Sequence, residues 1–161
     1  MIISESEADG GYKKNIRRGL IYRIQYRAQN VNGWSNYSPI AYIQAARVPD
    51  APLPVTVVTS DSTTITLKLG LCLDNGGSNL LKYTLYRDEG VLASPFTAIY
   101  EGLFDQEYKI SGLSPGLNYR LKTTATNAIG ESDASDLTSW YSASLPTKPV
   151  QLTRGTFSTR T

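Results

Sequence analysis

Residues 19–52, GLIYRIQYRAQNVNGWSNYSPIAYIQAARVPDAP, align without a gap with residues 116–149, GLNYRLKTTATNAIGESDASDLTSWYSASLPTKP. The offset is 97 residues, the difference between positions 19 and 116. The identical pairs are Gly19/Gly116, Leu20/Leu117, Tyr22/Tyr119, Arg23/Arg120, Ala28/Ala125, Asn30/Asn127, Gly33/Gly130, Ser35/Ser132, Ser38/Ser135, Ala46/Ala143, Pro49/Pro146 and Pro52/Pro149. A repeat of this period is typical of a chain built from small domains in tandem.

This period divides the 161 residues into one complete unit and two partial ones. We predict the end of one unit in residues 1–48, a complete unit in residues 49–146, and the start of another in residues 147–161. Proline-bearing linkers, Val48 to Pro54 and Leu145 to Pro149, mark the two boundaries. Proline stiffens a linker, so the sequence predicts a semi-rigid string of units.

Composition argues against an enzyme and against an obligatory polyanionic partner. Sixteen basic and 14 acidic residues leave a net charge of only +2, which favours neither nucleic acid nor a membrane surface as partner. Histidine is absent, and Cys72 is the only cysteine, so no catalytic site, zinc site or cofactor site is predicted. Cys72 is interpreted as a small filler at a strand end, with an oxidisable thiol as the alternative. No apolar run is long enough to cross a membrane.

Apolar and polar residues alternate in short runs that end at Gly, Pro, Asn, Asp or Ser, which predicts an all-β fold. In the run from Tyr119 to Thr126, alternate residues from Tyr119 face the core, and Tyr22, Ile24, Tyr26 and Ala28 are their earlier copies. The predicted strands are 55–59, 64–69, 81–87, 97–101, 107–110, 119–127 and 137–144. Seven strands of this kind fit an immunoglobulin-like sandwich of two sheets.

Three motifs in residues 49–146 resemble a fibronectin type III domain. They are Pro49-Asp50-Ala51-Pro52 at the start, Asp74-Asn75-Gly76-Gly77-Ser78 before the third strand, and Leu113-Ser114-Pro115-Gly116-Leu117-Asn118-Tyr119 before the sixth. The resemblance implies a two-sheet β-sandwich in tandem and a structural corner role for Tyr119 and its copy Tyr22, whose hydroxyls bond back to nearby backbone. The family usually has a Trp where this chain has Leu69 and a Pro where it has Cys72. We expect Leu71, Leu73, Tyr83 and Phe96 to fill the space left by the smaller Leu69.

Four residues of the first partial unit are candidate partner contacts: Trp34, Tyr37, Arg23 and Arg27. Trp34 and Tyr37 lie after a predicted Asn32-Gly33 turn, and their copies are Glu131 and Ala134, so the fold does not need rings there. They are interpreted either as a plug between units or as a partner-binding hot spot. Arg23 and Arg27 extend a basic stretch of Lys13, Lys14, Arg17 and Arg18, which is interpreted as a solvated face or as a contact for an acidic protein or glycan.

Asn36-Tyr37-Ser38 is an acceptor sequence for N-glycosylation, and Asn36 is the candidate site in a secreted chain. Pro39 follows directly and disfavours modification.

The preferred function is that of a structural and interaction protein, and no catalysis is expected. The repeated array acts as a semi-rigid spacer and protein-contact scaffold in an extracellular or cell-surface filament, matrix or adhesion molecule. The expected partners are neighbouring repeats, copies of the chain itself or a glycan. One alternative is a receptor ectodomain that binds ligand through Trp34, Tyr37 and residues 74–78. Others are a spacer in a secreted enzyme or an intracellular muscle-type array. The partial units are completed either by further sequence or by strand exchange between copies.

Overall fold

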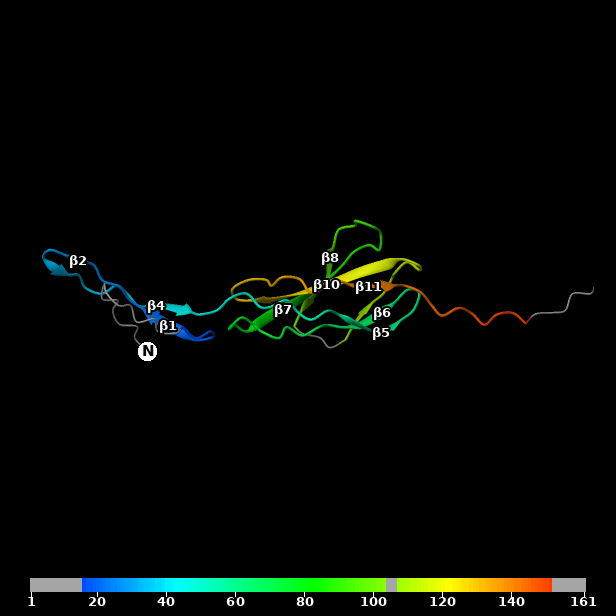
Figure 1. Cartoon of the computed structure of the whole chain (residues 1–161), viewed down its shortest axis with the longest axis horizontal. Coiled ribbons are helices and arrows are strands. Elements are labelled where there is room, and N and C mark those ends of the chain that lie inside the picture. The colour runs from blue at the N-terminus through cyan, green and yellow to red at the C-terminus, as the bar shows by residue number, and fades with distance from the viewer. Residues whose placement is uncertain (1–15, 104–106, 152–161) are drawn as a thin grey trace, which may run out of the picture.

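The computed structural model describes residues 16–103 and 107–151, and its strands form a two-sheet sandwich preceded by a hairpin (Figure 1). One sheet has the order β5-β6-β9 and the other has the order β11-β10-β7-β8. The strands are β5 (Thr56–Ser60), β6 (Ile65–Lys68), β7 (Leu80–Arg87), β8 (Thr97–Gly102), β9 (Tyr108–Ile110), β10 (Asn118–Asn127) and β11 (Thr138–Tyr141). This arrangement confirms the predicted all-β sandwich, and the described residues contain no helix.

The predicted strand boundaries agree closely with the structure except at the end of the last strand. We expected that strand to reach residue 144, but β11 ends at Tyr141. Its neighbour β10 is preceded by Gly116, which donates to Ser142 O at 2.7 Å, and by Pro115, which has no N–H to continue the ladder.

Apolar side chains from both sheets meet in one core. Leu67 of β6, Leu85 of β7 and Leu121 of β10 are fully buried in it. The hydroxyl of buried Tyr119 accepts a hydrogen bond from Ser114 N at 2.9 Å, which fixes the turn before β10. Leu69, the residue after β6, is also buried.

The expected filling of the space beside Leu69 is wrong for three of the four residues. Only Tyr83 is buried, whereas Leu71 and Leu73 are exposed because the chain has already left β6. Phe96 lies against Lys122 and Arg120, with the Lys122 Nζ 4.5 Å from its ring centroid.

A buried carboxylate fixes the connection between β7 and β8. Asp88 is 1% exposed, and it accepts hydrogen bonds from Arg120 N at 2.8 Å, Arg120 Nε at 2.5 Å and Gly90 N at 3.0 Å. Burial by itself raises the pKa of Asp88, but these hydrogen bonds outweigh it and hold the pKa below its ordinary value. Asp88 therefore stays ionised and joins β7 to β10.

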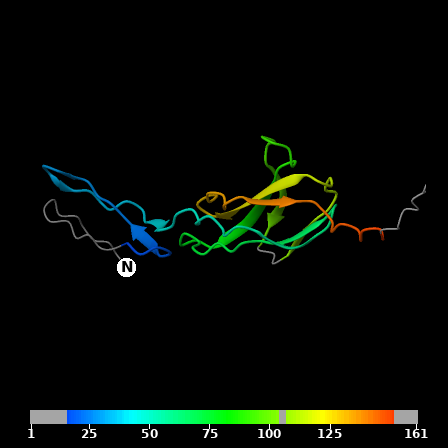
Figure 2. The same ribbon diagram turned by 45° about the vertical axis from the view of Figure 1, so that its right-hand side comes forward.

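The hairpin before the sandwich consists of β1 (Ile21–Ile24), which pairs with β4 (Ala41–Gln44), and of the short strands β2 (Gln29–Asn30) and β3 (Gly33–Trp34). It projects from one end of the sandwich in both views (Figures 1 and 2). Strands β1 and β4 pair in the same register as β10 and β11. Tyr22 pairs with Ile43, and the residues 97 positions later, Tyr119 and Trp140, also pair. The hairpin thus has the geometry of the last two strands of the sandwich.

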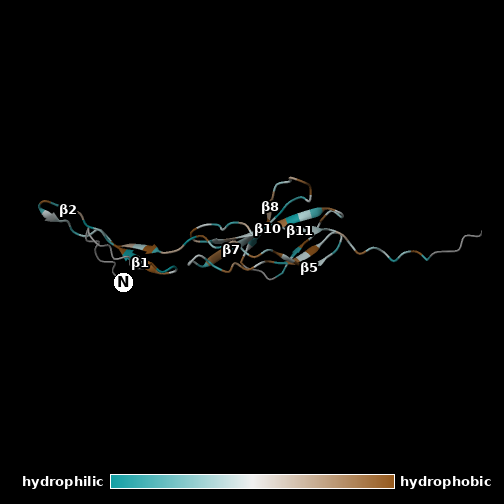
Figure 3. Ribbon diagram, in the orientation of Figure 1, coloured by the Kyte–Doolittle hydropathy of each residue, from teal (hydrophilic) through white to brown (hydrophobic). Residues whose placement is uncertain are grey.

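No second sheet covers the hairpin within the described residues. Of the four residues predicted to face a core, only Tyr22 is buried, while Ile24 and Tyr26 are 40% and 76% exposed. Hydrophobic segments therefore lie open on β1 and β4 (Figure 3).

Adjacent threonines of β10 give a matched test of polar burial. Both are buried, but Thr124 Oγ1 donates to Glu131 Oε1 at 2.6 Å, whereas Thr123 Oγ1 has no hydrogen-bond partner within the described part of the chain. We predict that Thr123→Val raises the free energy of unfolding by about 1 kcal/mol, and that Thr124→Val lowers it by about 1 kcal/mol. Urea denaturation of both variants measures the two changes, and a loss of stability in Thr123→Val contradicts the prediction.

Candidate functional site

The loop between β6 and β7 presents backbone carbonyl groups at the hairpin end of the sandwich. Asp74 Oδ1 accepts from Gly76 N, and Asn75 Oδ1 accepts from Gly77 N, both at 2.9 Å. These contacts are the Asx turns expected of Asp and Asn in loops. Gly76 and Gly77 have φ of +72° and +86°, which confirms that this loop needs glycine for its backbone conformation. The local sequence thus fixes the shape of the loop.

The linker before the sandwich binds this loop by backbone hydrogen bonds. Arg47 N donates to Gly76 O, and Asp50 N donates to Asp74 O, both at 2.9 Å. A Cβ atom on Gly76 would lie 2.2 Å from Arg47 O, which is far inside van der Waals contact. Glycine is therefore required here for close packing as well as for its φ angle.

The hairpin contacts the same loop through side chains. Arg18 Nη1 lies 2.5 Å from Asp74 Oδ2, and Gln44 Nε2 donates to Gly77 O at 2.9 Å. Arg47 Nη2 adds a second contact to Asp74 Oδ2 at 3.2 Å. The hydrogen bond from Gly76 N and the two guanidinium groups hold the pKa of Asp74 below its ordinary value. We call residues 18–19, 44–50, 74–78 and 127–130 the joint.

Asn127, at the end of β10, links the parts of the joint. Its Nδ2 donates to Arg47 O at 2.8 Å and to Asn75 O at 2.9 Å. Its Oδ1 accepts from Ile129 N at 2.8 Å and from Gly130 N at 3.1 Å. The side chain is nearly fully buried, so one amide satisfies the linker, the loop and the turn after β10.

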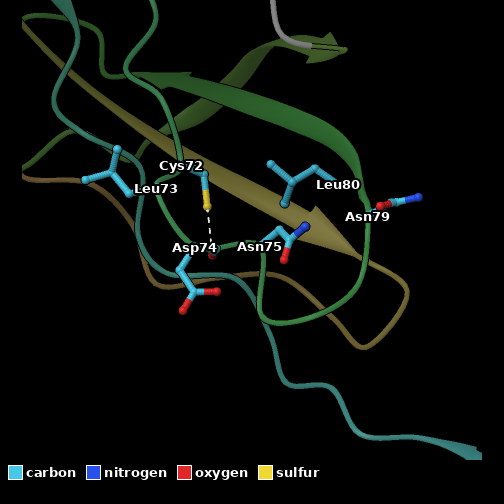
Figure 4. Close-up of a pocket in the computed structure, with 6 residues that line it drawn as sticks. All are labelled: Cys72, Leu73, Asp74, Asn75, Asn79 and Leu80. Atoms are coloured by element: carbon cyan, nitrogen blue, oxygen red, sulfur yellow. Dashed lines mark hydrogen bonds between the residues drawn. The ribbon is translucent and has the colours of Figure 1, made fainter. Parts of the chain in front are cut away.

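Cys72 lies on the sandwich side of the joint, in a shallow pocket with Leu73, Asp74, Asn75, Asn79 and Leu80 (Figure 4). Its Sγ is 3.2 Å from both Asp50 O and Asp74 O, so the single thiol proton has an acceptor in the linker and another in the loop. Burial raises the pKa of the Cys72 thiol and keeps it protonated at neutral pH. The thiol therefore packs against the joint as a neutral group.

Three of the four predicted partner contacts lie together in the hairpin. The guanidinium carbon of Arg27 is 4.3 Å from the ring centroid of Trp34 and 4.9 Å from that of Tyr37. Both rings are about half exposed, and β3, which carries Trp34, lies at the end of the hairpin away from the sandwich (Figure 1). Arg23 lies separately on β1, opposite Tyr42. These positions make Arg27, Trp34 and Tyr37 a single exposed cation–π cluster.

The remaining predicted site residues have clear positions. Asn36 is exposed, as N-glycosylation requires. The Tyr22 hydroxyl accepts from Arg17 N at 2.7 Å, which is the copy of the contact between Tyr119 and Ser114. Lys13 and Lys14 of the basic stretch lie outside the described residues.

Sequence reasoning missed the joint. It treated residues 74–78 only as turn formers or as a ligand-binding loop, it counted Arg18 only as part of the basic stretch, and it gave no role to Arg47 or Asn127. One signal was present, because Asn30 and Asn127 are identical at matched places of the repeat. Asn30 Oδ1 closes its own turn by accepting from Asn32 N at 2.9 Å, as Asn127 does.

Comparison with known proteins agrees with the fold. No protein-family model matches the chain. A mouse protein, fibronectin type III domain containing protein 3C1, is 30% identical over 136 residues, covering 83% of this chain and 10% of that protein. Chicken fibronectin type-III domain-containing protein 3a is 32% identical over 173 aligned positions, covering 96% of this chain and 14% of that protein. The chain thus spans only about a tenth of the length of these relatives.

Solved structures lead to the same fold. The sixth fibronectin type III domain of human fibronectin type III domain containing protein 3 has a TM-score of 0.55 at 24% identity, covering 66% of this chain and 96% of that one. Domains A168–A170 of titin have a TM-score of 0.55 at 19% identity, covering 73% of this chain and 39% of that one. The identity of 30% and 32% to the mouse and chicken proteins, over most of this chain, shows that the chain is a fibronectin type III domain protein, and these relatives indicate a structural or interaction domain.

Within residues 16–103 and 107–151, no three His, Cys, Asp or Glu side chains are grouped as a metal site would need. The described residues also contain no helix that is long and apolar enough to cross a membrane.

Substitution of two glycines with nearly equal φ angles distinguishes the cost of lost packing from the cost of backbone strain. Gly76 (φ +72°) touches the linker, whereas nothing lies within 4 Å of a Cβ atom placed on Gly112 (φ +73°). We predict that Gly112→Ala lowers the free energy of unfolding by about 1 kcal/mol, the cost of a left-handed conformation in alanine. Gly76→Ala should cost more and should shift the backbone amide resonances of Arg47 and Val48. Urea denaturation and NMR measure these effects, and equal behaviour of the two variants contradicts the packing role of Gly76.

Proposed function

We propose that this chain is a segment of a tandem fibronectin type III array that acts as a semi-rigid spacer and protein-contact scaffold. In this proposal residues 1–48 end one unit, residues 49–146 form a complete unit, and residues 147–161 begin another. The array belongs to an extracellular or cell-surface filament, matrix or adhesion molecule. Its function is to hold contact surfaces at fixed spacing, and it performs no catalysis.

The main support is that the hairpin and the sandwich each contain the same internal hydrogen bonds, between residues whose numbers differ by 97. Ser35 N donates to Ala28 O at 2.8 Å, and Ser132 N donates to Ala125 O at 2.8 Å. The hydroxyl of Ser38 accepts from Tyr26 N at 3.1 Å, and the hydroxyl of Ser135 accepts from Thr123 N at 3.0 Å. Serine bonds of this kind are specific to the local backbone path, so their repetition supports two copies of one unit.

The joint supports the spacer role. Backbone hydrogen bonds, the buried amide of Asn127 and the ion pairs of Asp74 all connect the hairpin and linker to the sandwich. A connection by side chains alone would be weak, because exposed ion pairs contribute little. Main-chain bonds packed against Gly76 and Gly77 favour one preferred orientation between units.

The cation–π cluster of Arg27, Trp34 and Tyr37 supports the contact role. Exposed Trp, Tyr and Arg residues are enriched at the centres of protein interfaces. We assign this cluster, together with Arg23, to a protein neighbour, either another repeat or a copy of the chain, with a glycan as the further candidate. The receptor alternative also uses Trp34 and Tyr37, but its third element, residues 74–78, is already occupied by the joint.

The spacer role is tested by a distance between matched positions. Tyr42 on β4 and Ser139 on β11 are exposed and are 97 residues apart. Spin labels there measure the step between units, in a Cys72→Ser background that keeps a hydrogen-bond donor toward Asp50 O and Asp74 O. We predict a narrow distance distribution by electron double resonance. Asp74→Ala should broaden it, because Arg18 loses its carboxylate partner, Arg47 keeps only Asp50, and Gly76 N loses the acceptor that shapes the loop.

Glu89→Ala is the matched control, because it removes an acidic residue that pairs with Arg87 outside the joint. Its distance distribution should equal that of the parent. A broad distribution in the parent chain contradicts a semi-rigid spacer.

The extracellular placement is tested on the native protein. We predict glycan mass on the peptide that contains Asn36, because this exposed acceptor sequence is modified only in the secretory route. Mass spectrometry of protein purified from its source measures this, and a wholly unmodified Asn36 removes this support for secretion.

A further inference from the structure

We propose that the far end of the sandwich, formed by Pro115, Gly116 and Tyr141, is a docking surface for the glycine-rich β6–β7 loop of a following fibronectin type III unit. The inference rests on the proposed tandem array and names the surface that continues it. We call these three residues and Ser144 the distal pole.

The repeat offset identifies the occupant. Gly19 corresponds to Gly116, and Gln44 corresponds to Tyr141. In the hairpin copy, Gln44 donates to Gly77 O at 2.9 Å, and Gly19 approaches so closely that a Cβ on Gly77 would lie 2.7 Å from Gly19 N. The hairpin copy of the distal pole is therefore covered by a β6–β7 loop in this structure.

The distal pole has the same backbone geometry as its copy. Gly116 N donates to Ser142 O at 2.7 Å, and Gly19 N donates to Ala45 O at 2.8 Å. The φ angles of Gly116 and Gly19 are +83° and +85°. The same loop can therefore approach both surfaces.

The distal pole is open within the described residues. Nothing lies within 4 Å of a Cβ atom placed on Gly116, whereas the same position on Gly19 is 3.7 Å from Gly77 O. Tyr141 is 64% exposed and Leu145 is 92% exposed. An exposed aromatic beside a bare backbone turn suits a partner that offers backbone carbonyl groups.

The chemistry of the two surfaces differs in charge. Arg18 and Arg47, which pair with Asp74, are replaced by Pro115 and Ser144. Tyr141 matches Gln44, and its hydroxyl is a hydrogen-bond donor as the Gln44 amide is. Ser144 matches Arg47, and its backbone N–H corresponds to the one that Arg47 donates to Gly76 O. We therefore expect the distal joint to form through backbone and aromatic contacts and to be insensitive to salt, unlike the first joint.

The test is a fusion of residues 1–146 to residues 50–161, which preserves the offset because position 50 corresponds to position 147. The fusion keeps the first joint intact and places an identical loop against the distal pole. Isotope labelling of the second copy alone allows its Gly76 and Gly77 amides to be followed by NMR. Both loops then differ only in the surface that faces them.

We expect the Gly76 and Gly77 resonances of the second copy to match those of the docked loop in the parent chain. High salt should shift the loop of the first copy and leave that of the second unchanged. Tyr141→Ala in the first copy should move the second loop away from the docked position. Leu137→Ala, an exposed change at the start of the same segment, should leave it in place.

The outcomes separate this inference from the proposed function. If the first loop is docked and the second is free, the distal surface is not a docking site, although the spacer proposal stands. If both loops are free, both proposals are overturned. If the second loop is docked only at high protein concentration, the surface binds copies in trans, and a following unit is not its occupant.

Discussion

The buried amide of Asn127 is the constraint on which the joint depends. It accepts from the turn after β10 and donates to Arg47 O and Asn75 O, so it fixes three segments that are far apart in the sequence. A buried amide left without these partners would be costly, because each unsatisfied polar atom loses its hydration. The strand that forms the core of the sandwich thus also sets where the linker leaves it.

Glycine residues let the linker and the hairpin pack closely against the β6–β7 loop. Gly76 and Gly77 take left-handed angles and also let the linker and hairpin approach at backbone distance. Main-chain carbonyl groups then meet main-chain amides, and the ion pairs around Asp74 add to a contact that is already formed. Cys72 completes it from the sandwich side as a protonated thiol. The joint is thus built from turn residues, with no large apolar interface.

Most of the sandwich could be predicted because its signals are local. Alternation and turn residues placed all seven strands, and the buried positions of Tyr119, Leu121 and Ala125 follow from that alternation. The joint could not be predicted in this way, since Arg47 and Gly76 meet only through the folded path of the linker. The expected packing of Leu71 and Leu73 failed for a related reason: Leu53 N bonds to Leu71 O at 3.0 Å as the chain crosses, and the side chains point to solvent.

The most direct measurement is amide hydrogen exchange at Arg47 in the unmodified chain. Its N–H donates to Gly76 O at 2.9 Å, although Arg47 itself is exposed in a linker. If the joint is a fixed connection, this amide exchanges at least about tenfold more slowly than an unprotected linker amide, because exchange requires local opening. Exchange at the rate of an unstructured peptide would contradict the account, since the linker would then move independently of the loop.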